Sequence, residues 1–300
     1  MRSAGERAVV SDASGALARA REGVLRHADG FPGVWTWAAE DLRTGARAAA
    51  GDDGWFPTAS AAKLPIHSAL ALAVSRGRVA WEEPVTVARE AAVGGSGVLA
   101  CLSMPLTLPL EDLAALMLVV SDNTATNAVI DRIGLEAIDA AFSEFGLADG
   151  LVVRRKIQDG PVIGEDVFAR ARAETLLRYL RLLADGRLPG AERTLRTARA
   201  QQHRSQMPRL LPLDGDGPDA LLVANKPGSD SGTRADFGLV EGMGRRFAFV
   251  MMVRDCADRG FAYDHPAERL IGECCRVTFD ALGEGRQVLR PRAGPPRPRR

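Results

Sequence analysis

Lysine is the basic residue that this sequence has least of. Its 39 Lys and Arg residues include only three lysines, Lys63, Lys156 and Lys226. An arginine stays protonated at physiological pH, whereas burial and nearby charge can turn a lysine into a neutral amine. A lysine that persists in such a chain is therefore a candidate for a position that needs a titratable amine.

Cysteine and histidine are also scarce, and neither is grouped as a metal site requires. The four cysteines without metal-ligand spacing are Cys101, Cys256, Cys274 and Cys275. We expect them to be free thiols, as in a reducing compartment. The four histidines, for which we predict structural roles, are His27, His67, His203 and His265. The sequence predicts no metal and no cofactor.

Long apolar runs are absent as well. No run reaches the roughly 18–20 residues that cross a bilayer, so we predict no membrane segment. Residues 1–14 are polar and lack the apolar core of a secretory signal. The sequence thus predicts a cytoplasmic protein, or a secreted one if a leader has been removed. The net charge of +1 provides no attraction to nucleic acid.

Apolar periodicity and turn residues predict the order of the elements. That order is a helix at 12–28, strands at 34–39 and 46–50, a helical middle with a long helix at 165–185, strands at 221–226, 235–240 and 245–253, and a last helix at 265–283. A glycine-rich stretch at 94–97 either borders a cleft or is a plain connector.

Early and late strands can pair in one sheet, which predicts an α/β (α+β) fold. We expect an antiparallel five-stranded sheet flanked by helices, with an inserted all-helical lobe. The predicted single domain covers 15–285, with the sheet lobe at 15–62 and 216–285 and the helical lobe at 63–215. Residues 1–14 and 286–300 are predicted to be flexible ends.

Ser60 and Lys63 stand three residues apart, where a loop gives way to an apolar helical run. On a helix such a pair shares one face, with Cβ atoms about 5–6 Å apart. Ser60 would then lie in the first turn, where free backbone N–H groups and the helix dipole favour negative charge. A serine becomes a useful nucleophile when a neighbouring base takes its proton. Ser-x-x-Lys alone is a weak signal, and an N-cap serine beside a solvated lysine is the more common explanation of it.

Two further motifs make the pair specific. The three motifs, in chain order, are Ser60-Ala61-Ala62-Lys63, Ser121-Asp122-Asn123 and Lys226-Pro227-Gly228. They resemble the Ser-x-x-Lys, Ser-Asp-Asn and Lys-Thr-Gly motifs of the serine β-lactamase and penicillin-binding-protein superfamily, and are most similar to those of class A β-lactamases. The resemblance covers residues 30–285 and is more specific for the fold than for the substrate.

This resemblance implies a role for each motif. Ser60 attacks an acyl carbon, and Lys63 receives or relays the proton. Lys226 is the neighbouring cation that lowers the pKa of Lys63. Ser121 passes a proton to the leaving group, and Asn123 holds the substrate amide and Lys63.

The resemblance also implies substrate-binding residues at the third motif. The backbone N–H groups of Ser60 and Ser229 would form an oxyanion hole beside Gly228. Such a donor is worth about 10²–10³ in rate. Arg234 would bind a substrate carboxylate.

The sequence departs from that family in two places. A Glu-x-x-Leu-Asn loop that positions the deacylating water should follow Ser-Asp-Asn by roughly 35 residues, but no such pentapeptide exists here. Asp159 and Glu165 are the nearest carboxylates and candidate bases for water, although an Arg155–Asp166 ion pair is an equally good use of the charges there. Pro227 stands where the family has a hydroxyl, and a proline in a strand indicates an edge or a distortion.

Together these features predict a serine acyl-enzyme hydrolase or acyltransferase acting on a small amide, ester or lactam. Its partners would be a small-molecule acyl donor and an amine or alcohol acceptor. Two alternatives fit the same residues. One is a class A-like β-lactamase with a non-standard deacylation base, and the other is a non-catalytic ligand-binding protein on the same fold.

Overall fold

The computed structural model describes residues 4–158, 167–213 and 220–283. Its main sheet has five antiparallel strands in the order β2-β1-β10-β9-β8. The strands are β1 (Val34–Asp41), β2 (Arg47–Gly51), β8 (Leu222–Asp230), β9 (Thr233–Gly242) and β10 (Arg245–Arg254). The prediction of early and late strands in one antiparallel sheet is therefore confirmed.

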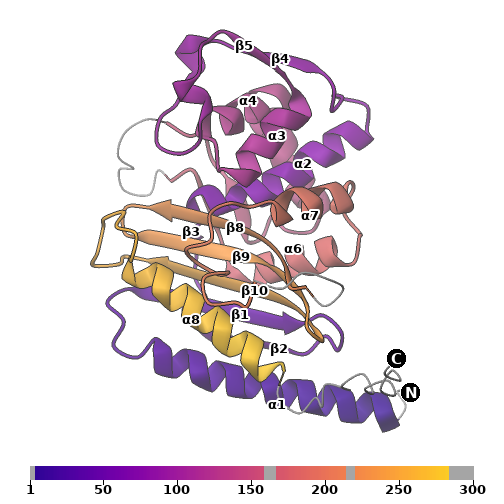
Figure 1. Ribbon diagram of the computed structural model, residues 1–300. Helices are drawn as coiled ribbons and strands as arrows, with labels where there is room; N and C mark the ends of the chain where they lie inside the picture. The colour runs from indigo at the N-terminus through magenta and orange to yellow at the C-terminus, as the bar shows by residue number, and fades with distance from the viewer. Residues whose placement is uncertain (1–3, 159–166, 214–219, 284–300) are drawn as a thin grey trace, which may run out of the picture.

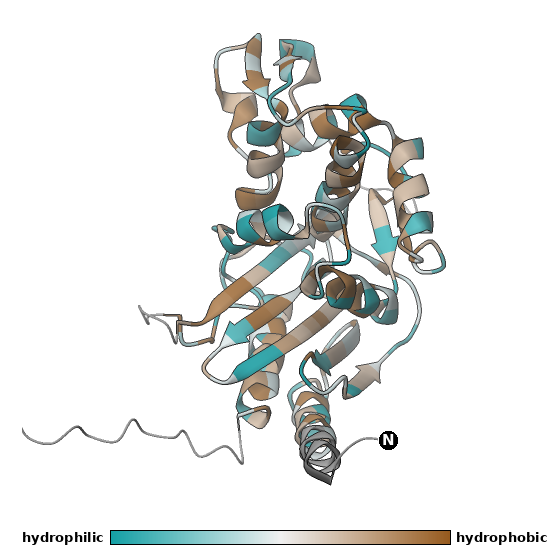
Figure 2. Ribbon diagram, turned by 90° about the vertical axis from the view of Figure 1, so that its right-hand side faces the viewer, coloured by the Kyte–Doolittle hydropathy of each residue, from teal (hydrophilic) through white to brown (hydrophobic). Residues whose placement is uncertain are grey.

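Both faces of the sheet are covered, and the central strand β10 shows why. Its side chains alternate between two hydrophobic clusters. Phe247 and Phe249 pack with the terminal helices α1 (Ala4–His27) and α8 (Pro266–Ala281), whereas Val250 and Met252 pack toward the helical lobe. Burying each such side chain stabilises the fold by roughly 1.5–3 kcal/mol. In Figure 2 the strands of the sheet are brown over much of their middle, with teal segments nearer their ends.

The helical lobe is built around α2 (Lys63–Ser75), whose residues from Lys63 to Ala73 are all buried. The helices of the lobe and of the sheet face beneath it are α3 (Leu110–Val119), α4 (Asn123–Ile133), α5 (Leu135–Glu144), α6 (Ala173–Ala184) and α7 (Ala191–Arg199). Figure 1 shows α2, α3 and α4 above the β8 edge of the sheet, with α1 and α8 below its other face. No helix in the described ranges is long and apolar enough to span a bilayer.

The inserted lobe is not all-helical, which corrects the prediction. It holds the hairpin of β4 (Pro84–Val87) and β5 (Leu106–Pro109), and also β6 (Leu151–Val153) and β7 (Ala169–Ala171), which form a small sheet with β3 (Phe56–Pro57) from the segment before the lobe. Strands of two to four residues are too short to show an alternating pattern. The helix predicted at 165–185 begins only at Ala173, because residues 169–171 pair with β3 and β6 instead.

The start of α1 also differs from the prediction. The helix begins at Ala4, so the segment predicted to be a flexible end is helical from that residue onward. The other predicted flexible end, 286–300, lies outside the described residues.

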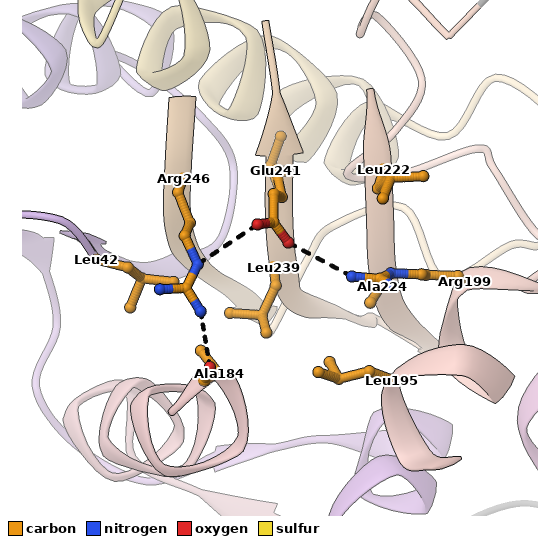
Figure 3. A pocket seen from close by; sticks show the side chains of 10 residues that line it. Leu42, Ala184, Leu195, Arg199, Leu222, Ala224, Leu239, Glu241 and Arg246 are labelled. Carbon is orange, nitrogen blue, oxygen red and sulfur yellow. Dashed lines mark hydrogen bonds and ion pairs between the residues drawn. The ribbon is translucent and has the colours of Figure 1, made fainter. Parts of the chain in front are cut away.

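Ion pairs join the sheet to the helical lobe near the ends of β9 and β10. Glu241 on β9 pairs with Arg246 on β10 at 3.7 Å and with Arg199 at the end of α7 at 3.4 Å, and Arg246 also donates to the Ala184 carbonyl of α6 (Figure 3). These side chains border a cavity of about 20 Å³. It has room for no more than a water molecule or so, and it contains none of the motif residues.

Candidate active site

Ser60 lies on a single 3₁₀ turn, Ala59–Ala62, directly before α2. The turn is fixed to β7 because the Thr58 N–H donates to the Ala169 carbonyl at 3.0 Å. Ala59 has φ of +45°, a conformation that residues with a side chain rarely adopt. Strain of this kind persists only where the surroundings enforce it, and it is concentrated at functional sites. Ser60 is half-buried and lines a cleft.

Strand β8 passes very close to this turn at Gly228. A Cβ added to Gly228 would lie 2.2 Å from the Thr58 carbonyl oxygen and 2.9 Å from the Ser60 nitrogen. Only glycine allows this approach. It brings the backbone of the third motif beside the backbone N–H of Ser60.

Ser121 lies on the link between α3 and α4, with φ of +58°. Its neighbour Asp122 holds this link in place. One carboxylate oxygen of Asp122 caps α4 by accepting from the Ala125 N–H at 2.8 Å. The other accepts from the Val98 and Leu99 N–H groups at 2.6 and 2.8 Å. The motif aspartate is therefore structural, and it positions the residues on either side of it.

The ammonium group of Lys63 is buried against this link. Its Nζ donates to the Ser121 carbonyl at 2.6 Å, to Ser121 Oγ at 3.1 Å and to Asn123 Oδ1 at 2.8 Å. Burial, then the charge of Lys226, lowers the pKa of Lys63 well below its ordinary value, with Asp122 opposing the shift. A buried lysine of this kind can exist as a neutral amine and accept a proton.

Lys226 reaches the same hydroxyl from the sheet. Its Nζ lies 3.1 Å from Ser121 Oγ and donates to the Pro227 carbonyl at 2.7 Å. Burial lowers the pKa of Lys226 to about 7, opposed by the charge of Asp236. The Ser121 hydroxyl thus lies between the amines of Lys63 and Lys226, which can carry a proton in either direction. Ser60 Oγ makes no hydrogen bond with a described residue, so it is free to meet a ligand.

The cleft at this junction has a volume of about 610 Å³. Its lining includes the motif residues Ser60, Ser121, Asn123, Lys226 and Ser229. The glycine-rich stretch forms one border, since Asn123 donates from its side chain to the Gly94 carbonyl at 2.8 Å and from its backbone to the Ser96 carbonyl at 2.9 Å. The alternative of a plain connector is therefore wrong. Another hollow of about 690 Å³, at the α4–α5 corner, contains none of the motif residues.

Gly228 and Arg234 are the predicted binding residues that do not line the cleft. Arg234 is fully buried. Its Nε donates to Glu268 at 3.0 Å, and its other nitrogens donate to the carbonyls of Asp230, Thr233 and Gly260. A guanidinium held in this way is shielded from the cleft by Glu268, so the structure does not support the prediction that it meets a substrate carboxylate.

The two candidate water bases, Asp159 and Glu165, lie outside the described residues, as does Asp166 of the predicted ion pair. The described part of that loop is held by Asn127, whose side chain donates to the Ile157 carbonyl at 2.7 Å and accepts from the Ile157 N–H at 2.9 Å. Ile157 itself lines the cleft. In the described ranges, no group of three His, Cys, Asp or Glu side chains could hold a metal ion.

Several residues of the cleft were not predicted from the sequence. They are His203, Gln206, Asp230 and Glu268. The first two lie on the irregular segment after α7, and Glu268 comes from the first turn of α8. No local motif marks them, because only the folding of distant segments brings them to the cleft. Burial and the charge of Lys226 lower the pKa of His203, which favours its neutral form.

A sheet flanked by helices, a helical lobe and a serine with two buried lysines at their junction define a class: the serine β-lactamase fold. The chain belongs to the β-lactamase enzyme family, whose model matches residues 16–282. No curated protein matches the chain. The family and fold identify a serine hydrolase of β-lactamase type.

Solved structures agree with this assignment. A β-lactamase from Sphaerobacter thermophilus is 26% identical, with a TM-score of 0.79 over 89% of this chain and 97% of that one. A protein called PBP-A is also 26% identical, with a TM-score of 0.75 over 87% and 95% of the two chains. A mutant of PBP-A, 24% identical and solved as an acyl-enzyme complex with penicillin G, has a TM-score of 0.76 over 88% and 96% of the two chains.

Replacing Gly228 by alanine tests the close approach of β8 to the serine turn. The added methyl must push the strand away from Ser60, so we expect acylation of Ser60 by an activated ester to fall by about 10²-fold, the effect of losing one oxyanion-hole donor. Rates of p-nitrophenyl ester acylation would measure this. Gly15→Ala is the matched control, because its new Cβ has only an ordinary contact at 3.7 Å. Equal rates in the two variants would contradict the proposed contact.

Proposed function

We propose that this protein is a serine acyl-enzyme hydrolase or acyltransferase that acts on a small amide, ester or lactam. The observation that carries the proposal is the Ser121 hydroxyl, 3.1 Å from each of two buried lysine amines at the cleft that Ser60 lines. Buried amines that share one hydroxyl form a proton relay, and a nucleophile needs such a relay to lose its proton and to protonate a leaving group.

In the first half of the reaction, Ser60 Oγ bonds to the acyl carbon and its proton passes to neutral Lys63. The proton then moves through Ser121 Oγ to the leaving nitrogen or oxygen as its bond to the acyl carbon breaks. Lys226, as an ammonium, stabilises the negative charge that develops. The backbone N–H groups of Ser60 and Ser229 are the oxyanion donors in this proposal.

The second half of the reaction needs a base for the incoming nucleophile. Of the described carboxylates, Asp230 and Glu268 line the cleft, and Glu268 is already paired with Arg234. The loop residue held by Asn127 is Ile157, which has no titratable group. Neutral His203 is the candidate base for the incoming nucleophile, and an amine or alcohol acceptor should remove the acyl group faster than water does.

The second candidate is a β-lactamase that deacylates with a base other than the family's glutamate. The family match and the PBP-A mutant trapped with penicillin G favour lactams as acyl donors. Turnover of nitrocefin that survives Asp159→Asn and Glu165→Gln but not Ser60→Ala would support hydrolysis without those carboxylates. A non-catalytic binding protein would instead keep its ligand affinity and biological activity in Ser60→Ala.

Mass spectrometry tests the proposal directly. After incubation with an activated ester, an amide or penicillin G, we expect a mass increase equal to the acyl group, located at Ser60 and absent from Ser60→Ala. Added hydroxylamine or a primary amine should remove it faster than water alone. If no reagent adds mass at Ser60, the protein is not a serine acyl-enzyme.

The variant Ile157→Glu tests whether the lack of a carboxylate at this position slows hydrolysis of the acyl-enzyme. Asn127 holds the backbone of Ile157 at the cleft through two hydrogen bonds. The new carboxylate would therefore extend into the cleft from a fixed backbone position and could activate water there. We expect the acyl-enzyme lifetime, followed by mass spectrometry, to fall at least about tenfold, within the range of general-base effects. Ile157→Gln is the matched control, and an equal decrease in both variants would attribute the effect to loop disruption instead.

The pH profile of acylation tests the two lysines. Neutral Lys63 must accept the proton, and its lowered pKa places the rise in rate with pH well below the ordinary lysine value of 10.5. Lys226 acts as an ammonium, so the rate should fall again as it deprotonates at about 7. The pre-steady-state burst at Ser60 would report both limbs. A flat profile across this range would contradict these assignments.

A further inference from the structure

The wall of the cleft beyond Ser229 is formed by Gln206, Asp230, Phe261 and Glu268. This wall presents hydrogen-bond acceptors, whereas a site that binds a carboxylate would present hydrogen-bond donors. Arg234 is buried behind this wall and its charge is matched by Glu268. The groups that reach the cleft are Asp230 and Glu268. The net charge of the wall is therefore −1, from one guanidinium and two carboxylates.

Each of these carboxylates keeps one oxygen without a donor. Asp230 Oδ1 accepts from the Ser231 N–H at 2.7 Å, and Glu268 Oε1 accepts from Arg234. No described residue donates to Asp230 Oδ2 or to Glu268 Oε2. The two residues are held together by the same guanidinium, which also donates to the Asp230 carbonyl at 2.8 Å.

A third unpaired acceptor comes from Gln206, a side chain that lines the cleft and is 1% exposed. Its Nε2 contacts Ser229 Oγ at 3.1 Å and the Gly228 carbonyl at 3.3 Å. A carbonyl can only accept, so the contacting atom must be the amide nitrogen. Gln206 Oε1 is buried and has no hydrogen-bond partner. A buried oxygen without a donor is costly, which indicates a donor supplied from outside.

An exposed aromatic ring completes the wall. Phe261 lines the cleft with 68% of its surface exposed, and Arg234 lies 5.3 Å from its ring centroid. Carboxylates beside an aromatic face are a setting that binds ammonium groups. The cations that line the cleft elsewhere are Lys226, on the far side of Gly228, and Arg155, from the 154–158 loop.

We propose that this wall is a subsite for a cationic group of the acyl donor, an ammonium or guanidinium rather than a carboxylate. The inference rests on the proposed acyl-enzyme function and specifies its substrate class. An ammonium has three N–H donors, and three residues that line this wall, Asp230, Glu268 and Gln206, each keep an oxygen to which no described residue donates. Glu268 is the specificity-determining residue for two reasons. Its carboxylate lines the cleft, and its ion pair with Arg234 keeps that guanidinium from binding a substrate carboxylate.

Matched p-nitrophenyl esters test the subsite. They carry 6-aminohexanoyl, hexanoyl and adipoyl chains, which are ammonium-bearing, neutral and carboxylate-bearing acyl groups of equal length. Rates of Ser60 acylation are corrected for the reaction with Ser60→Ala. We expect the ammonium ester to react at least tenfold faster than the carboxylate ester at low substrate, and the difference to shrink with salt.

Charge-removing variants should reduce or reverse this preference. Asp230→Asn should reduce it, and Glu268→Gln should reverse it because Arg234 loses its matching charge. In both variants the preference is taken as the ratio of the ammonium ester's rate to the neutral ester's rate, so that a loss common to all esters cancels. Glu273→Gln is the matched control, since Glu273 is also on α8 and pairs with His27 away from the cleft. A wild-type preference for the carboxylate ester, or an equal loss on all three esters, would overturn the subsite.

Direct binding separates this proposal from the proposed reaction. In the Ser60→Ala protein, 6-aminohexanamide should bind more tightly than hexanamide by calorimetry, and Asp230→Asn should abolish the difference. If no ester acylates Ser60 but the amine still binds, the reaction is wrong and the subsite stands. If the neutral ester acylates Ser60 but neither amide nor ester shows a charge preference, the subsite is wrong and the reaction stands.

Discussion

The site depends on two lysine ammonium groups buried against one serine hydroxyl. Removing a charge from water is expensive unless it is paired or neutralised, and no carboxylate among the described residues contacts either amine directly. Carbonyl oxygens of Ser121 and Pro227 and the Asn123 amide oxygen take the N–H groups instead. These acceptors satisfy the donors without fixing the charge, so burial can lower the pKa of each amine. The hydrogen bonds of the site therefore leave each lysine able to gain or lose a proton, and do not hold it in an ion pair.

This arrangement requires two strained backbone positions. Ala59 and Ser121 both have positive φ, each at a cost of roughly 1–3 kcal/mol for a residue with a side chain. Contacts outside the cleft hold them there. The Asp122 carboxylate accepts from three backbone N–H groups around Ser121, and β8 packs against the turn of Ala59 through Gly228. These contacts of the fold therefore fix the positions of Ser60 and Ser121.

In the proposed function, the residues that carry out the reaction at Ser60 differ from those that select the substrate. The relay lies at the junction of the helical lobe and the sheet, whereas the acceptor wall is formed by the end of β8, the segment after α7 and the start of α8. A buried Arg234 paired with Glu268 is stable without any ligand, so it places no demand on the substrate for a carboxylate. Ile157 leaves the described part of its loop without a base for water. Family chemistry and substrate class can thus differ within one fold.

The sequence by itself determined the sheet and the reactive pair. Apolar runs bounded by turn residues predicted a five-stranded antiparallel sheet, and the motifs in which two of the three lysines stand singled out Lys63 and Lys226. Tertiary structure decided which secondary structure the short segments adopt. Strands of two to four residues have no periodicity to read, so β3 and β6 were not predicted and β7 replaced part of the helix predicted at 165–185. It also decided that Arg234 is buried, and that Gln206 and Glu268 reach the cleft. Those positions depend on which distant segments pack together, and no local pattern in the chain records that.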